Sequence, residues 1–595
     1  MKRLLVLMLS VLLCMPIIAT GCGDKSRDYL VVCAGPNPDT IDPALNSAVD
    51  GATMILHAFS GLVGWAQKDD GSLELVPDCA EELPEPTIDE ETNKATYVFT
   101  LKEGLKWSDG QELKASDFEY AWKRAASVEL GADYGYMFEV IDGYYGEDEE
   151  GNLEVTGDIN VTANDADRTL TVVLTQDVPY FYELCAFPTF MPVREDVIEA
   201  NPDTWATKPE TYIGNGPYKI TKWTRNDKIV FEKNDYYHNA DKVKIKKIEF
   251  ALSDDAGAML ANYKNGTFDF IDEVPNNEIS SLKTNYPKEF FTEGQLGTYY
   301  LNFNINADIF DGLTYEEAVK FRKAISLIID RNYIVEEIGQ AGQQPANSFV
   351  PTGLTDADTS KQFVDLNGPN RDGKGYFSVA KEDLEANRAE AVELLKEAGF
   401  TYDEEEKKFT DLPEMDYLYN TNTGHQAIGE YLQSALAEYG FVITLKVQEW
   451  GVFLNTRKQG NYTFARNGWL GDYNDPITFL DMWTSGSGNN DVQFGKGDHA
   501  NLAVYKITLK DEEGEDVILT NKTWAESYDV LIQKIKTETD IETRYELMHQ
   551  AEDLLMETGC IIPIYYYVDI FMIKQHVKGF YTSPLGYKFF MYAEI

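Results

Sequence analysis

The chain has 595 residues, of which 43% are hydrophobic and 26% charged, a composition typical of a folded protein with more than one domain. Its 100 Asp and Glu outnumber 52 Lys and Arg, so the formal net charge is −48. A surface this negative repels nucleic acids and anionic lipid headgroups, which excludes proteins that bind those partners.

The chain opens with the pattern of an export signal. Two basic residues precede an almost wholly apolar run over residues 4–19, which is too short to span a bilayer. Cys22 follows a few small residues, and this arrangement resembles a bacterial lipoprotein signal, in which the cysteine becomes the lipidated first residue. We therefore predict a signal peptide over 1–21, a tether over 22–29 and a protein anchored by lipid to the outer face of the bacterial cell membrane. A secreted protein cut near the same place is the alternative.

The rest of the chain mixes strand and helix patterns. Residues 96–107 alternate apolar and polar side chains as a half-buried strand does. Helical apolar stripes follow over 116–127, 314–331 and 387–400, and residues 430–450 indicate a helix, a glycine stop and an alternating strand. The fold class predicted from this mixture is α/β, or more generally mixed α+β, in several domains.

Two helix starts carry the spacing of a capping box, in which a hydroxyl and a carboxylate three residues later cap each other's backbone N–H groups. These are Ser116 with Glu119, and Thr314 with Glu317. Two acidic stretches, 146–154 and 510–516, are expected to form hairpin tips on the surface.

Beyond Cys22, four cysteines remain, and they are far apart in the chain: Cys33, Cys79, Cys185 and Cys560. They show neither a CxxC pair nor the spacing of a zinc site. Buried thiols, or one or two disulfides, are both compatible with this pattern.

Motifs of the common enzyme families are missing from the sequence. It contains no GxSxG and no HExxH, and its six histidines are scattered singly. Residues 368–375 nearly match a phosphate-binding loop, but Gly375 stands where the magnesium-binding hydroxyl is needed. We therefore predict no enzyme activity, no catalytic residue, no metal and no cofactor.

One stretch near the C-terminus, "GWLGDYNDPITFL" (468–480), holds two carboxylates three residues apart, Asp472 and Asp475. They could be an acid/base pair of a secreted hydrolase, metal ligands, or a counter-charge for a cation. The stretch supplies too few oxygen ligands for a calcium loop. Asp475 and Pro476 are expected to shape a turn and the start of a helix.

The order of several motifs is more informative than any one of them. The most specific is "YVFTLKEGLKWSDGQELKASDFEYAWKRA" (97–125). The others are "NPDTIDPALNS" (37–47), "GNGPYKITKW" (214–223), "FRKAISLIIDRNYI" (321–334), the 468–480 stretch and "IPIYYYVDIFMIKQHVKGF" (562–580). This series resembles the extracytoplasmic solute-binding proteins of the oligopeptide and dipeptide ABC importers (solute-binding family 5), and most of all the oligopeptide-binding members. The resemblance runs through nearly all of the chain after the leader.

The resemblance implies a two-lobed fold, like that of the periplasmic binding proteins, with a hinge and an extra insertion domain. The parts expected are lobe I over 30–62, an insertion domain over 63–200, lobe I again over 201–298, lobe II over 299–564 and the end of lobe I over 565–595.

The resemblance also implies roles for particular residues. In the oligopeptide-binding proteins an aspartate in a Trp-x-x-Asp-Tyr motif binds the α-ammonium group of the peptide, and Asp472 is the matching position. Arg466 matches an arginine that helps to receive the peptide's C-terminal carboxylate. His425 lies near a histidine of similar role, but the match needs a one-residue gap, and a surface or cap role is the alternative.

The walls of the expected cleft come from neighbours of this pair and from the start of the chain. Gly468, Trp469 and Tyr473 are expected to line it, with core packing of Trp469 as the alternative. Asn37 and Pro38 match the part of lobe I that pairs with the peptide backbone.

The function implied is a monomeric receptor that captures short peptides and delivers them to an ABC permease. Alternatives within the family are a receptor for another cargo: a dipeptide, a signalling peptide, an oligosaccharide or a chelated metal. The alternative from another class is the hydrolase that uses Asp472 and Asp475.

Overall fold

The computed structural model describes residues 27–147, 153–497, 504–510 and 516–595. The predicted signal peptide and Cys22 lie outside the described residues. Within the described part of the chain, no helix is long and apolar enough to cross a membrane.

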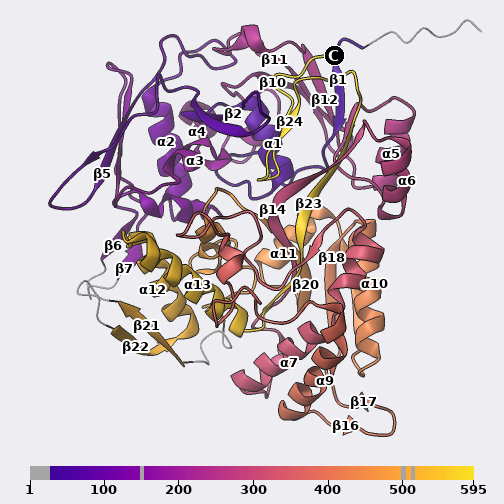
Figure 1. Ribbon diagram of the computed structural model, residues 1–595. Coiled ribbons are helices and arrows are strands. Elements are labelled where there is room, and N and C mark those ends of the chain that lie inside the picture. Colours follow the sequence, from indigo (N-terminus) through magenta and orange to yellow (C-terminus); the bar gives the residue numbers. More distant parts are fainter. Residues whose placement is uncertain (1–26, 148–152, 498–503, 511–515) are drawn as a thin grey trace, which may run out of the picture.

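A mixed sheet of 11 strands runs through the molecule (Figure 1). Its first half contains β10 (Tyr218–Thr224), β11 (Lys228–Lys233), β12 (Lys247–Ala251), β1 (Leu30–Cys33) and β13 (Phe270–Ile271) in that spatial order. The second half contains β20 (Phe464–Leu470), β18 (Met415–Asn420) and β19 (Ile443–Gln448). Strand β1 is parallel to both of its neighbours, as is β18.

Two long antiparallel strands join these halves, β14 (Phe290–Phe303) and β23 (Ile561–Ile573). One end of β23 pairs with β13, and one end of β14 pairs with β20. Between these ends, the pairing of β14 with β23 is interrupted from Gly294 to Thr298, opposite Val568 to Tyr566. The short strand β15 (Gln344–Pro345) also pairs with β23. The two halves of the sheet are therefore connected by two adjacent antiparallel strands whose pairing is interrupted near the middle (Figure 1).

A smaller antiparallel sheet forms between β1 and β10 in the sequence. It contains β4 (Thr87–Ile88), β5 (Ala95–Thr100), β9 (Thr169–Leu174) and β8 (Val161–Asn164), with the hairpin of β2 (Val63–Gln67) and β3 (Leu73–Pro77) beside it in the chain. Strand β5 confirms the first part of the half-buried strand predicted over 96–107: Tyr97 and Phe99 are buried, Val98 is exposed, and the strand ends at Thr100. Trp122 and Phe118 of helix α2 (Ala115–Ala126) are fully buried in the core of this region.

The start of α2 corrects one prediction. The expected capping box of Ser116 and Glu119 is wrong, because the helix begins at Ala115 and the carboxylate of Asp117 accepts the backbone N–H of Lys114 at 2.9 Å. Ser116 donates instead to Asp165, and Glu119 accepts the backbone N–H of Ala163. The residues at the helix start are therefore Lys114 and Asp117, two positions before the predicted pair Ser116 and Glu119.

Helices α10 (Thr423–Ala437) and α11 (Trp450–Lys458) pack on the second half of the sheet, and α7 (Tyr315–Ile328) packs against α9 (Leu384–Glu397). Helices α12 (Trp524–Thr537) and α13 (Ile541–Glu557) pack against each other. The capping box at Thr314 and Glu317 is confirmed, with both reciprocal bonds present at the start of α7. The glycine stop after α10 is Gly440, at φ 101°.

The remaining helices are α1 (Val49–Ala58), α3 (Phe181–Ala186), α4 (Glu195–Ala200), α5 (Ala256–Lys264), α6 (Ile279–Asn285) and α8 (Arg331–Tyr333). Among the strands that the structure describes, four further pairs form antiparallel hairpins. Two of them are β6 (Tyr145–Glu147) with β7 (Leu153–Val155) and β16 (Tyr402–Asp403) with β17 (Lys408–Phe409). The other two are β21 (Val504–Lys510) with β22 (Asp516–Thr523) and β24 (Tyr581–Thr582) with β25 (Lys588–Phe589). The β6–β7 and β21–β22 hairpins contain the two acidic stretches, whose tips lie outside the described residues.

Cys33, Cys79, Cys185 and Cys560 are all buried and free of disulfides. Burial raises the pKa of the Cys33 thiol to about 12, so it does not ionise at neutral pH. Of the two possibilities that the sequence left open, buried thiols or disulfides, the structure shows buried thiols.

We expect none of these four thiols to react with Ellman's reagent in the native protein, because only an accessible thiolate attacks it. A chain that starts at residue 23 contains only these four cysteines, so all four should react once urea unfolds it. Reaction of any thiol within minutes under native conditions would contradict this expectation.

Candidate functional site

A cavity of about 380 Å³ lies where the two halves of the sheet meet. Residues of both halves line it, together with Gln295 and Tyr567 from the connecting strands β14 and β23. The residues that line it include Pro36, Asn46, Ser47, Asp50, Tyr134, Glu273, Asn420, Asn422, His425, Trp450, Arg457, Lys458, Arg466 to Asp472 and Asp491. Such a mainly apolar cavity with a few converging polar groups is typical of a ligand-binding site.

Asp472 follows the end of β20 and presents a buried carboxylate to this cavity, only 7% exposed. The Tyr134 hydroxyl donates to Oδ1 at 3.0 Å and the Thr478 hydroxyl to Oδ2 at 3.4 Å. The hydroxyl oxygen of Thr478 also accepts the backbone N–H of Asp472 at 3.0 Å, which holds this residue in place. Burial raises the pKa of Asp472 well above its usual range, against the lowering effect of these two hydroxyls.

No Lys, Arg or His in the described part of the chain forms an ion pair with Asp472. Two neutral hydroxyls do not offset the cost of burying an ionised carboxylate. A cation that enters the cavity would supply the missing charge, through charge-assisted hydrogen bonds.

Arg466 lies on β20, six residues before Asp472, and is also buried in the cavity wall. Its Nε and Nη2 both donate to Oδ1 of Asn420, at 2.8 and 2.6 Å. Its guanidinium carbon lies 5.1 Å from the ring centre of Phe453 and 5.5 Å from that of Trp450. Among the described residues no carboxylate lies within ion-pair distance of Arg466, so one cavity presents two opposite charges with no partner on the protein.

His425 also lines the cavity, in the first turn of α10, where the Asn422 side chain accepts its backbone N–H. Burial, and then the nearby Arg466, lower the pKa of His425 well below its usual 6.5. The imidazole is therefore neutral, and its Nδ1 lies 3.3 Å from the Tyr299 hydroxyl. It can hydrogen-bond a carboxylate beside Arg466, but it does not add a second positive charge.

Gly468 and Trp469 lie in the cavity wall as expected from the sequence. The Trp469 indole donates to the backbone carbonyl of Thr478 at 2.8 Å, and the ring belongs to the main hydrophobic core, so Trp469 both packs and lines the cavity. At Gly468 a Cβ atom would lie 2.1 Å from the Tyr567 hydroxyl oxygen. Glycine leaves room here for the Tyr567 side chain of β23, which reaches Gly468 of β20 past the intervening strand β14.

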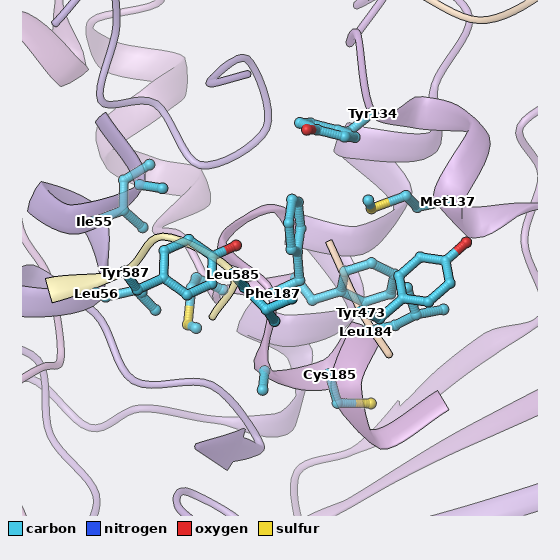
Figure 2. Packing of buried hydrophobic residues seen from close by; sticks show 14 of the residues in the cluster. Ile55, Leu56, Tyr134, Met137, Leu184, Cys185, Phe187, Tyr473, Leu585 and Tyr587 are labelled. Carbon is cyan, nitrogen blue, oxygen red and sulfur yellow. The ribbon is translucent and has the colours of Figure 1, made fainter. Parts of the chain in front are cut away.

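Tyr473 does not line the cavity. Its ring stacks on Tyr180 with 4.4 Å between centres, and its hydroxyl donates to Asp481 at 3.1 Å. Figure 2 shows Tyr473 among buried side chains such as Leu184. The chain turns after Asp472, so the next side chain points into the core and not along the wall.

Asn37 and Pro38 also lie outside the cavity lining. The Asn37 side chain donates to the carbonyl of Pro38 at 2.7 Å and accepts the Trp223 indole at 3.4 Å. The residues of this segment that line the cavity are Pro36 and those from Asn46 to Asp50. Asn37 and Pro38, the two residues named from the sequence, are therefore not among those that line this cavity, and their pairing with a peptide backbone stays a prediction.

Asp475 has a structural role. Its carboxylate binds the Arg544 guanidinium through two bonds of 2.8 and 3.0 Å, and its Oδ1 also accepts the Ile477 N–H at 3.1 Å. Pro476 follows as the first residue of a short 3-10 helix, so the turn expected here is confirmed. A paired, capping carboxylate that does not line the cavity cannot be the second acid of a hydrolase that uses Asp472.

Several cavity residues were not predicted from the sequence. Arg457 and Asp491 form a buried pair at 3.6 Å, and Asn467 bonds to both. Lys458 of α11 donates to the Ser47 hydroxyl at 2.8 Å and pairs with Asp133. The Lys458 contacts join residues 411 and 325 positions apart. The contacts of Asn467 with Arg457 and Asp491 span 10 and 24 positions, but they follow no known motif, so no sequence pattern pointed to either set.

We expect Gly468→Ala to weaken ligand binding at least about tenfold, because the new methyl group overlaps the Tyr567 hydroxyl and displaces a side chain that lines the cavity. Gly486→Ala is the control, since a Cβ there meets nothing within 4 Å. Adding Tyr567→Phe should restore part of the affinity measured by calorimetry. Unchanged binding in Gly468→Ala would show that this close approach does not matter.

Comparison with known proteins identifies the family. Residues 74–491 match the bacterial extracellular solute-binding proteins, family 5 Middle. The chain belongs to this family. It is 32% identical to the dipeptide-binding protein DppE of Bacillus subtilis over 510 residues, which are 85% of this chain and 82% of that protein. It is 31% identical to the oligopeptide-binding protein OppA of the same organism over 582 residues, 96% of this chain and 93% of that protein.

Among solved structures, this family 5 chain resembles Haemophilus influenzae OppA in complex with RPPGFSPFR. The TM-score is 0.77 at 26% identity, covering 96% of this chain and 99% of that one. The two-lobed periplasmic-binding-protein fold implied by the sequence is thereby confirmed.

Proposed function

We propose that this protein is a receptor that captures short peptides in the cavity between its lobes and delivers them to an ABC importer. The observation that carries the proposal is the pair of unpartnered opposite charges, Asp472 and Arg466, in one buried cavity. A free peptide has an ammonium group at one end and a carboxylate at the other. Each end would supply the partner that one of these side chains lacks.

The polar groups around Arg466 suit a carboxylate. Within the described part of the chain, the guanidinium of Arg466 has one acceptor, the amide oxygen of Asn420, and a guanidinium can bind a carboxylate through two parallel bonds. Neutral His425 beside it can donate one more hydrogen bond. The relatives named as dipeptide- and oligopeptide-binding proteins, and the complex with RPPGFSPFR, support the same class of ligand.

Other cargoes of the family fit this charge pair less well. An oligosaccharide has no charge for Asp472 or Arg466, and a chelated metal has no fixed pair of ends. A dipeptide or a signalling peptide is zwitterionic and remains within the proposal. A hydrolase is not proposed, because Asp475 is bound to Arg544.

The lobe boundaries implied by the resemblance are part of the proposal. We place the hinge at the interrupted pairing of β14 and β23, between Gly294 and Thr298 and opposite Tyr566 to Val568. The expected boundaries at 298/299 and 564/565 lie within a few residues of this interruption. Closure around a ligand would bend the chain here, and Lys458 with Ser47 would hold the lobes together.

We further propose that the protein works as a monomer outside the cytoplasm, attached to the membrane through lipidated Cys22. Residues between Cys22 and β1 would then form the tether. Globomycin treatment or a Cys22→Ala variant should leave the unprocessed leader in place, which a mass measurement of the membrane fraction detects.

The first test is native mass spectrometry of the purified protein, followed by denaturation and analysis of what is released. A set of short peptides would support a peptide receptor and give the range of lengths directly. Release of a single non-peptide compound, or no bound ligand together with no response to a peptide library, would overturn the proposal.

A further inference from the structure

Asp50 presents a second carboxylate to the ligand cavity. It lies in the first turn of α1, and both of its carboxylate oxygens are shielded from solvent without a hydrogen-bond partner among the described residues. It is the only acidic side chain lining the cavity for which this holds, since Asp472, Asp491 and Glu273 each accept hydrogen bonds.

The position of Asp50 is fixed by its neighbour. A Cβ atom at Gly51 would lie 2.0 Å from Oδ1 of Asn46 and 2.6 Å from the carbonyl oxygen of Thr40. The start of α1 therefore packs directly on the preceding loop. Asp50 cannot leave the cavity without moving the helix.

Trp450 lines the same cavity from the other half of the molecule, and its indole nitrogen also has no hydrogen-bond partner among the described residues. Burial raises the pKa of Asp50 to about 6, and the nearby N–H groups of Gly51, of Asp50 itself and of Trp450 reduce this rise without completing a hydrogen bond to the carboxylate. The Trp450 ring also lies 5.5 Å from the guanidinium of Arg466. Asp50 is therefore on the Arg466 side of the cavity, whereas Asp472 contacts Tyr134 and Thr478.

The charges of the cavity do not balance when a zwitterion binds. Arg457 pairs with Asp491, and Lys458 pairs with Asp133. Three acidic side chains, Asp50, Glu273 and Asp472, then face the single cation Arg466, and burial raises the pKa of each of them. The two ends of a peptide add one charge of each sign, so a further cation is needed to stabilise the ionised form of Asp50.

A role at the helix start does not account for this carboxylate. Acids in the first turn are stabilised by the helix dipole, an effect that is modest and needs no burial. Here the carboxylate is shielded from water and lacks a hydrogen bond, which costs free energy unless a partner arrives.

We propose that Asp50 forms a subsite for a positively charged side chain, so that the receptor prefers peptides that carry lysine or arginine. The inference rests on the proposed function, since it names the class of peptide that the same cavity takes. The side chain would enter on the Arg466 side, beyond the residue whose ammonium group binds Asp472.

The experiment compares tripeptides of alanine that carry one lysine at position one, two or three with matched peptides that carry Nε-acetyl-lysine there. Acetylation keeps the length of the side chain and removes its charge. We expect the lysine peptide to bind at least about tenfold more tightly at one position, as measured by calorimetry. In Asp50→Asn this ratio should fall below about twofold, because the lysine peptide loses more affinity than the acetyl-lysine peptide does.

Asp39→Asn is the matched control, because Asp39 acts on Asp50 only through its charge, is exposed and does not line the cavity. It should keep the preference for lysine. Equal binding of the lysine and acetyl-lysine peptides at all three positions would overturn the inference even if Asp50→Asn did not fold. Equal weakening of both peptides in Asp50→Asn would instead show a structural role. Failure of every peptide to bind would overturn the proposed function as well.

Discussion

Acetylating the N-terminus of a bound peptide is expected to cost about 2–5 kcal/mol of binding free energy, or roughly 30-fold or more in affinity. Acetylation removes the positive charge that would pair with Asp472. The carboxylate would then be enclosed with only the Tyr134 and Thr478 hydroxyls. Calorimetric titration of the free and acetylated forms of one peptide measures this difference.

The Asp472→Asn variant separates this charge effect from the bulk of the acetyl group. It should bind the free peptide weakly and lower the ratio of free to acetylated affinity towards one. C-terminal amidation is the matched control, because it acts on Arg466, and its effect should be the same in Asp472→Asn as in the unchanged protein. An acetylated peptide that binds as tightly as the free one would show that Asp472 does not receive the ammonium group.

The same carboxylate gives the binding a definite pH dependence. Its pKa in the empty cavity is raised by burial, and a bound ammonium group requires the ionised form. Affinity for the free peptide should therefore fall as the pH drops through this raised pKa, because a proton must leave Asp472 before the peptide binds. The acetylated peptide, which a protonated Asp472 tolerates, should lose less affinity over the same range.

Local chemistry explains what the sequence predicted well. Asp472, Arg466 and Trp469 stand within seven residues, so a strand and the turn after it must bring them near one another. The capping box at the start of α7 depends only on Thr314 and Glu317, which are three residues apart. Asp475 and Pro476 form a turn for which adjacent residues are sufficient.

The predictions that failed depended on contacts with other parts of the fold, which the local sequence does not specify. Tyr473 was expected in the wall, but which way its side chain points depends on the bend after Asp472 and on the partner ring of Tyr180. At the start of α2 two capping patterns competed, and Asp117 is used because it also accepts the Trp107 indole. Asp50 and Lys458 became site residues only through folding of segments about 400 positions apart.

Arg544→Met is expected to lower the free energy of unfolding by about 3–5 kcal/mol, because it leaves a buried carboxylate without its partner. Arg544 and Asp475 have side chains only 8% and 6% exposed and are joined by two bonds. Urea unfolding of the ligand-free protein, followed by tryptophan fluorescence, measures the change. Lys381→Met is the control: it removes a cation from a pair whose side chains are 61% and 52% exposed, and it should cost no more than about 1 kcal/mol.

Adding Asp475→Asn to Arg544→Met tests the charge explanation directly. The amide oxygen can still accept the Ile477 N–H, and the buried charge is gone, so the double variant should be more stable than Arg544→Met alone. The turn closed by this pair also carries Thr478, which holds Asp472. Arg544→Met should therefore weaken peptide binding, and the double variant should recover part of it. If the double variant is no more stable than Arg544→Met, packing of the guanidinium rather than its charge stabilises the turn.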